Sequence, residues 1–155
     1  MVKNPLLIIL GPTASGKTKL AVALATDLHA EIISADSRQV FKGMDIGTGK
    51  DLDEYIVNGI KVPYHLIDHM PAGSRYQVDA FKEDFFRVFD SLTARQVLPI
   101  LCGGTGMYIH SILQNHQYTM IPVNPMLRER LSSLSLMELQ QVLRTYPVES
   151  TAHAD

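Results

Sequence analysis

The sequence predicts an α/β fold in which a parallel sheet is flanked by helices. Short runs of apolar, mostly branched residues alternate with longer segments whose apolar residues recur every three or four positions. Most of the apolar runs end in glycine or polar residues, as strands do where they lead into loops at a sheet edge. Strands that alternate with helices favour a doubly wound sheet, with ligands at the carboxyl ends of its strands.

The most specific motif follows the first predicted strand, residues 6–10. The sequence Gly-Pro-Thr-Ala-Ser-Gly-Lys-Thr at 11–18 matches the complete phosphate-loop pattern G-x-x-x-x-G-K-[ST]. A helix is predicted directly after it, over 19–29. A chance glycine turn is the alternative, but the strand before and the helix after disfavour it. The sequence therefore predicts a P-loop NTPase-like fold that binds a phosphorylated ligand.

The residue types of this loop suit the chemistry of phosphate binding. Gly11 and Gly16 permit backbone conformations in which successive N–H groups converge on phosphate oxygens, and the next helix adds its positive end. Lys17 supplies a mobile positive charge, and the Thr18 hydroxyl can ligate Mg²⁺ beside the phosphates. The predicted diphosphate-binding residues are Gly11, Pro12, Thr13, Ala14, Ser15, Gly16, Lys17 and Thr18, with Thr18 as the metal ligand.

The same patterns predict three further strands and four further helices. A glycine-punctuated loop with one helical turn is expected between the second and third strands. A phosphate-loop sheet normally has five strands, so a C-terminal strand is expected to be missing. The strands are predicted at 31–35, 63–68 and 97–102, the helical turn at 51–55, and the helices at 76–96, 106–113, 126–131 and 135–146, the last opened by a capping box.

Composition limits the classes of protein that this chain resembles. Its 155 residues are 46% hydrophobic and 19% charged, as in a globular protein. Fourteen basic residues against sixteen acidic ones give no polyelectrolyte character, so any contact with nucleic acid must depend on a local site. One cysteine excludes a disulfide framework, and no segment has the length of a signal peptide or membrane span. These features predict a cytoplasmic protein without a membrane partner.

The second chemical feature is Asp36, which follows the second predicted strand. Its position places it in the same crevice as the phosphate loop, where a carboxylate can act as a general base or hold metal-bound water. An ordinary turn before Ser37 is the alternative. The fourth strand ends in glycines at 103–106 rather than in a carboxylate, which disfavours an ATPase or GTPase.

Three weaker features leave alternatives open. The glycines at 103–106 fit either a second phosphate loop without lysine or the close approach of a backbone or a base. His65 and His69 are expected on one face of an extended strand without a third ligand, which disfavours a zinc site.

The loop after Asp36 forms the third of these features. Basic Arg38, Lys42 and Lys50 stand against acidic Asp36 and Asp45, which makes the loop weakly positive and compatible with RNA phosphates.

Four blocks of sequence resemble the tRNA dimethylallyltransferases, also called tRNA isopentenyltransferases. They are the phosphate loop, the long segment Ser-Ala-Asp-Ser-Arg-Gln-Val-Phe-Lys-Gly-Met-Asp-Ile-Gly-Thr-Gly-Lys at 34–50, Tyr-His-Leu-Ile-Asp at 64–68, and Gly-Gly-Thr-Gly-Met-Tyr-Ile at 103–109. The blocks occur in the family's order and spacing. Family members are about twice as long as this chain, so the resemblance implies an N-terminal portion: a phosphate-loop catalytic core at 1–114 and the start of a helical tRNA-binding insertion at 115–155.

The resemblance implies transfer of a dimethylallyl group from its diphosphate to the exocyclic amine of an adenine beside the tRNA anticodon. Asp36 would accept the amine proton, Lys17 would stabilise the leaving diphosphate together with Mg²⁺, and Thr13 would donate to the bridging oxygen. The partners implied are dimethylallyl diphosphate and a tRNA anticodon stem-loop, with a monomeric full-length enzyme. The tRNA contacts that match the family pattern are Asp36, Ser37, Arg38, Gln39, Thr105 and Arg128.

Departures and alternatives remain. Gly49 and Asp51 stand where the family usually has alanine and proline. An adenylate isopentenyltransferase, or a small-molecule or nucleoside kinase, could use the same loop and an aspartate base, although the arginine-rich lid of a kinase is absent from the sequence. A third alternative is a non-catalytic chain that binds diphosphate or tRNA weakly.

Overall fold

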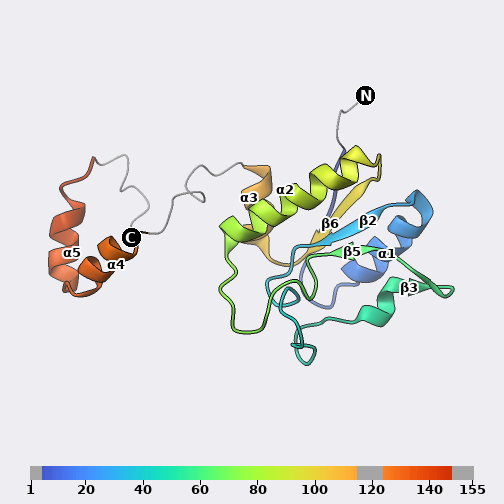
Figure 1. Ribbon diagram of the computed structural model, residues 1–155, viewed down its shortest axis with the longest axis horizontal. Helices are drawn as coiled ribbons and strands as arrows, with labels where there is room; N and C mark the ends of the chain where they lie inside the picture. The colour runs from blue at the N-terminus through green and yellow to red at the C-terminus, as the bar shows by residue number, and fades with distance from the viewer. Residues whose placement is uncertain (1–4, 115–123, 148–155) are drawn as a thin grey trace. The chain divides into compact units, whose positions relative to one another are not determined.

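The computed structural model describes residues 5–114 and 124–147 (Figure 1). The chain divides into two compact units, one within residues 1–119 and the other within residues 120–155. The first unit contains the sheet and the phosphate loop, and the second contains two helices. Among the described residues, no helix is both long and apolar enough to cross a membrane.

The sheet of the first unit is parallel, as predicted. Its strands are β1 (Leu7–Leu10), β2 (Glu31–Ser34), β5 (Tyr64–His65) and β6 (Pro99–Gly103), in the spatial order β1-β6-β2-β5. Parallel strands end at the same edge of a sheet. The loops that follow β1, β2 and β6 therefore meet there.

Helices cover both faces of this sheet because neighbouring residues of a strand point to opposite sides. Helix α1 (Lys17–Leu28) packs in the hydrophobic cluster that contains Ile32 and Ile100. Helices α2 (Val78–Ala94) and α3 (Gly106–Leu113) pack in a second cluster, which contains the adjacent residues Ile33 and Leu101. In Figure 1, α1 and α2 lie on opposite sides of the strands. The predicted doubly wound arrangement is confirmed.

Two predictions about residues 51–68 need correction. A short helix, η1 (Leu52–Tyr55), lies where a helical turn was predicted, but a hairpin of β3 (Ile56–Val57) and β4 (Ile60–Lys61) follows it. Its turn, Asn58-Gly59, has φ values of 52° and 78°, and this dipeptide is the usual signal for such a hairpin.

The predicted strand at 63–68 is also too long. Leu66 and Asp68 have φ values of 62° and 51°, so the extended backbone of β5 stops at His65. Left-handed conformations of this kind interrupt a strand.

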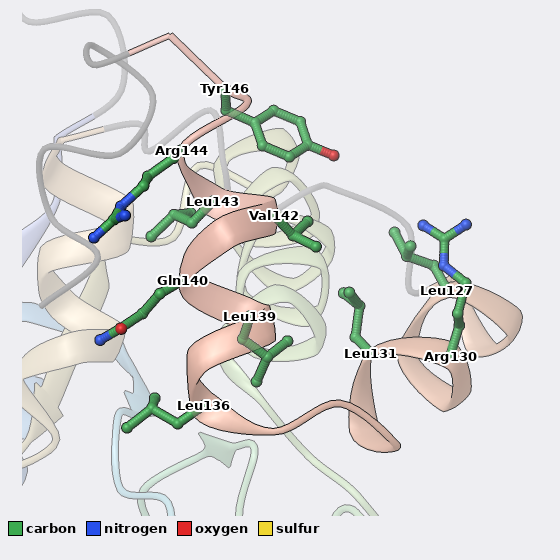
Figure 2. A pocket seen from close by; sticks show the side chains of 10 residues that line it. All are labelled: Leu127, Arg130, Leu131, Leu136, Leu139, Gln140, Val142, Leu143, Arg144 and Tyr146. Atoms are coloured by element: carbon green, nitrogen blue, oxygen red, sulfur yellow. The ribbon is translucent and has the colours of Figure 1, made fainter.

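The described part of the second unit, residues 124–147, contains α4 (Pro125–Ser132) and α5 (Leu136–Leu143), close to the predicted helices. The predicted capping box is confirmed: the Ser135 N–H donates to Glu138 Oε2 at 2.8 Å, and the Glu138 N–H donates to Ser135 Oγ. Figure 2 shows Leu131 of α4 pointing toward Leu139 and Val142 of α5, which line a pocket of about 770 Å³. Neither helix has a buried residue, so this unit contributes little to a hydrophobic core.

Candidate functional site

The phosphate loop connects β1 to α1 through left-handed backbone. Ala14 has φ of 61°, and Gly16, the N-cap of α1, has φ of 80°. No side chain caps this end of α1, so its first N–H groups keep no side-chain partner. The Lys17 ammonium donates a hydrogen bond to the carbonyl oxygen of Pro12 across the loop. Free helix amides beside a lysine form an anion-binding site.

Gly11 leaves room for the lysine stem. A Cβ atom built at Gly11 would lie 3.6 Å from Cδ of Lys17 and 3.2 Å from Oγ of Ser15. The second distance is tighter than ordinary contacts, so a side chain at Gly11 would press on the loop. The glycine therefore permits the close packing of Ser15 and Lys17 against the end of β1.

A pocket of about 350 Å³ lies at the carboxyl edge of the sheet. Its walls come from the phosphate loop, the end of β2, the loop before η1, η1 itself and the end of β6. The volume suits a diphosphate with a short organic group better than a large ligand. The lining residues are Thr13, Ala14, Ser15, Gly16, Lys17, Thr18, Lys19, Asp36, Gln39, Thr48, Gly49, Asp51, Glu54, Tyr55, Cys102, Gly103 and Gly104.

Asp36 lies in this pocket within a hydrogen-bonded turn. Its Oδ1 accepts the backbone N–H of Arg38 at 2.9 Å. The Ser37 N–H donates to Oγ1 of Thr105 at 3.0 Å, and the Thr105 hydroxyl donates to Ser37 Oγ at 3.3 Å. Thr105, which was predicted to contact tRNA, thus bonds within the protein and joins the loop after β6 to the loop that carries Asp36.

The sequence left two roles open for the glycines at 103–106: a second phosphate loop, or the close approach of a backbone or a base. The surroundings of Gly103 distinguish between these two roles. The Ala35 N–H donates to the carbonyl oxygen of Cys102 at 2.8 Å, and the Thr105 N–H donates to the Ala35 carbonyl oxygen at 3.1 Å. A Cβ atom at Gly103 would lie 2.3 Å from that same oxygen. Gly103 is therefore glycine because the backbone next to Asp36 approaches it closely.

Replacing Gly103 by alanine is expected to destabilise the fold by about 1–3 kcal/mol, the usual cost of overpacking. The clash is with backbone, which cannot rotate away as a side chain can. Urea unfolding of the variant measures the change. Gly106→Ala is the matched control, because a Cβ atom there meets nothing within 4 Å. Equal stability of the two variants would contradict the close approach.

Gln39 connects the Asp36 turn to the opposite wall of the pocket. Its Nε2 donates to the carbonyl oxygen of Gly49 at 3.0 Å, and its Oε1 accepts the Ser34 hydroxyl at 3.1 Å. That this wall belongs to the site was not predicted from the sequence. The available signal was the glycine-punctuated sequence, together with the departures from the family pattern at Gly49 and Asp51, both of which line the pocket. The wall residues missed are Thr48, Gly49, Asp51, Glu54 and Tyr55.

Burial keeps two polar groups of the pocket uncharged. It raises the pKa of the Cys102 thiol to about 11, an effect that Lys17 opposes and Asp36 reinforces. It also raises the pKa of Tyr55 well above its usual range. At neutral pH the thiol and the phenol are therefore neutral.

Two weaker expectations about side chains are wrong. His65 and His69 do not share a strand face: Nε2 of His65 lies 2.7 Å from Oε2 of Glu31, and Nε2 of His69 lies 2.9 Å from Oδ2 of Asp84. Residues 5–114 and 124–147 contain no cluster of three or more His, Cys, Asp or Glu side chains that could hold a metal.

Lys50 is the second of these corrections. Its side chain is 1% exposed and bonded to carboxylates, so it cannot contact RNA phosphates as predicted, whereas Arg38 and Lys42 are exposed. Arg128 lies exposed on α4 in the second unit, and its role in binding tRNA stays a prediction.

Comparison with known proteins decides the family. The family model described as IPP transferase matches residues 39–154. The chain belongs to this family. It is 54% identical over 146 residues to tRNA dimethylallyltransferase 2 of Phocaeicola vulgatus and 52% identical over 151 residues to tRNA dimethylallyltransferase 2 of Porphyromonas gingivalis. The resemblance found in the sequence motifs is confirmed.

Solved structures agree with the P-loop NTPase-like fold. The full-length tRNA isopentenylpyrophosphate transferase from Bacillus halodurans superposes with a TM-score of 0.69 at 35% identity, over 95% of this chain and 45% of that one. A eukaryotic dimethylallyltransferase acting on tRNA also gives a TM-score of 0.69, at 25% identity, over 84% of this chain and 33% of that one. The chain covers 48% and 50% of the two bacterial relatives named above, and so spans about half their length.

Proposed function

We propose that this chain is the diphosphate-binding part of a tRNA dimethylallyltransferase. The observation that carries the proposal is the pocket of about 350 Å³ into which the phosphate loop and Asp36 both project. An anion site and a carboxylate base in one small pocket suit the transfer of a group from a diphosphate to an amine. The family membership of the chain supports the same chemistry.

In the proposed reaction, the exocyclic nitrogen of an adenine attacks the allylic carbon of dimethylallyl diphosphate. A carbon–nitrogen bond forms while the carbon–oxygen bond to the diphosphate breaks, and the bond pair leaves with the diphosphate. Lys17 and the loop N–H groups stabilise the negative charge that develops on the leaving group. Thr13 donates a hydrogen bond to the bridging oxygen, and Asp36 accepts the proton that the amine loses.

A Mg²⁺ ion fits this site as a partner of the diphosphate. The Thr18 hydroxyl lines the pocket beside Lys17, and hydroxyl and phosphate oxygens are the hard donors that Mg²⁺ prefers. When bound, Mg²⁺ would neutralise charge on the diphosphate.

The acceptor in this proposal is an adenine in a tRNA anticodon stem-loop. A base inside a stacked loop must leave the stack to reach a carboxylate in a pocket. In this proposal the base meets the turn of Asp36, Ser37, Arg38 and Gln39, in which Asp36 and Gln39 line the pocket and Arg38 is exposed. A buried, unpaired Cys102 agrees with a reducing compartment, so we place the reaction in the cytoplasm. The family resemblance alone is the ground for proposing a monomeric enzyme.

Replacing Lys17 by alanine is expected to abolish binding of dimethylallyl diphosphate–Mg²⁺ while the protein stays folded. Lys17 is the cation at the end of the phosphate loop, and its loss removes a charge-assisted contact to the diphosphate. Isothermal titration calorimetry on the chain measures the affinity, and circular dichroism checks the fold. Lys61→Ala is the control, because Lys61 is exposed on β4 and lies outside the pocket lining.

The same titration with ATP–Mg²⁺ separates a prenyltransferase from a kinase. We expect tighter binding of dimethylallyl diphosphate than of ATP. Unchanged affinity in the Lys17 variant would refute the diphosphate site, and a clear preference for ATP would favour a kinase instead.

A further inference from the structure

The loop from Phe41 to Lys50 contains a buried ammonium group that the proposed reaction does not use. The Lys50 side chain is 1% exposed. Its Nζ donates to the carbonyl oxygen of Phe41 at 2.8 Å, to Oδ1 of Asp45 at 3.0 Å and to Oδ1 of Asp68 at 2.6 Å. An ammonium group has three donors, so this set satisfies all of them.

These contacts are built to hold a charge inside the protein. Burial alone would lower the pKa of Lys50, but the hydrogen bonds and charges of Asp68 and Asp45 outweigh it and raise the pKa. The lysine therefore stays charged at neutral pH, and both carboxylates remain paired. Without the ammonium group the Phe41 carbonyl oxygen and the Asp68 carboxylate, whose side chain is 35% exposed, would lose this donor, whereas the Asp45 carboxylate, 68% exposed, would turn to water.

The partners of Lys50 come from the start and the middle of its own loop and from the segment after β5. Phe41 begins the loop, and its neighbour Lys42 donates its N–H to the Met70 carbonyl oxygen at 2.8 Å. Asp68 donates its own N–H to the carbonyl oxygen of Gln39 at 3.0 Å. Hydrogen bonds thus join residues 39–42, which follow Asp36, to residues 68–70, and Lys50 bonds to both of these segments. We call these contacts the Lys50 ring.

Gly49, next to Lys50, is the point at which the Lys50 ring reaches the pocket. Its carbonyl oxygen accepts a hydrogen bond from Nε2 of Gln39, and Gly49 itself lines the pocket. Thr48, on its other side, is buried and donates to the carbonyl oxygen of Met44 at 2.7 Å. The loop is therefore folded on itself, and Lys50 fixes its returning end.

We propose that Lys50 is a positioning residue for the pocket wall that contains Thr48 and Gly49: it holds the Gly49 carbonyl where that carbonyl orients the Gln39 amide in the pocket that Asp36 also lines. Its significance for transfer to adenine rests on the proposed function. The diphosphate side does not depend on it, because the loop geometry there is set by Gly16 and by the bond from Lys17 to Pro12.

The test compares Lys50→Met with Lys42→Met in the chain itself. Methionine keeps the length of the stem but removes the charge, and the exposed Lys42 removes the same charge from the same loop. The side-chain amide signals of Gln39 in a ¹⁵N–¹H NMR spectrum report its bond to Gly49. We expect these signals to shift in Lys50→Met alone, and backbone amides of 41–50 to exchange roughly tenfold faster or more.

Affinity for dimethylallyl diphosphate–Mg²⁺ separates positioning from general destabilisation. A positioning role predicts unchanged affinity and unchanged exchange in β1, β2 and β6. Unchanged Gln39 signals and loop exchange in folded Lys50→Met would overturn the proposal, as would equal changes throughout the sheet.

A second variant protects the test against unfolding. Asp68→Asn keeps the shape of the partner and removes only its charge, at a side chain that is 35% exposed in the segment after β5. The same local changes in smaller degree support the proposal, and their absence contradicts it. If the wild-type chain does not bind the diphosphate at all, the proposed function fails, while the Gln39 signals still decide the role of Lys50.

Discussion

Replacing Asp36 by asparagine, in a transferase of full family length that carries this N-terminal half, is expected to lower turnover by about two to four orders of magnitude, as loss of a general base does. Asparagine keeps the oxygen that accepts the Arg38 N–H at 2.9 Å, so the turn should persist. It cannot accept the proton of the adenine amine. Single-turnover prenylation of an anticodon stem-loop measures the rate.

Asp53→Asn is the control for the change in charge. Asp53 is exposed on η1 and lies outside the lining of the pocket. Both substrates should bind both variants nearly normally. Near-normal turnover in the Asp36 variant would mean that its carboxylate is only the acceptor of a turn, which was the alternative considered from the sequence.

The parts of the site that follow from local sequence were predictable. The phosphate loop is one continuous octapeptide between a strand and a helix, so its position follows from the pattern alone. Asp36 directly follows a strand that the sequence also reveals. Parallel strands bring their ends together, and the pocket accordingly contains Lys17, Thr18 and Asp36.

The role of Lys50 was not predictable, because its partners are distant in sequence. A basic residue in a glycine-rich loop looks like a surface charge until Asp68, 18 residues away, is brought beside it. Gly103 is similar, because it is glycine on account of the carbonyl oxygen of Ala35, which directly follows the neighbouring strand β2. The turn at Asn58-Gly59, by contrast, carried a local signal that was available and was missed.

A chain of these 155 residues alone is expected to be inactive in tRNA prenylation. The strand that carries the phosphate loop, β1, lies at an edge of the sheet, and Leu10 at its end is 58% exposed. An apolar strand left unpaired on one side favours association or aggregation. Helices α4 and α5 likewise bury none of their residues. Both features suit surfaces that another part of a longer protein covers.

The chemistry gives a second reason. The transition state has the character of an allylic cation, which water would capture, so the reaction needs an enclosed channel. Dimethylallyl diphosphate should still bind, because β1, the phosphate loop and α1 all lie before residue 30. The measurement is single-turnover prenylation of an adenine-containing anticodon stem-loop by the purified chain, with a full-length relative as the positive control. A comparable rate would show that the phosphate-loop unit and two helices already enclose the reaction, and that the other half of the family's length is dispensable for transfer.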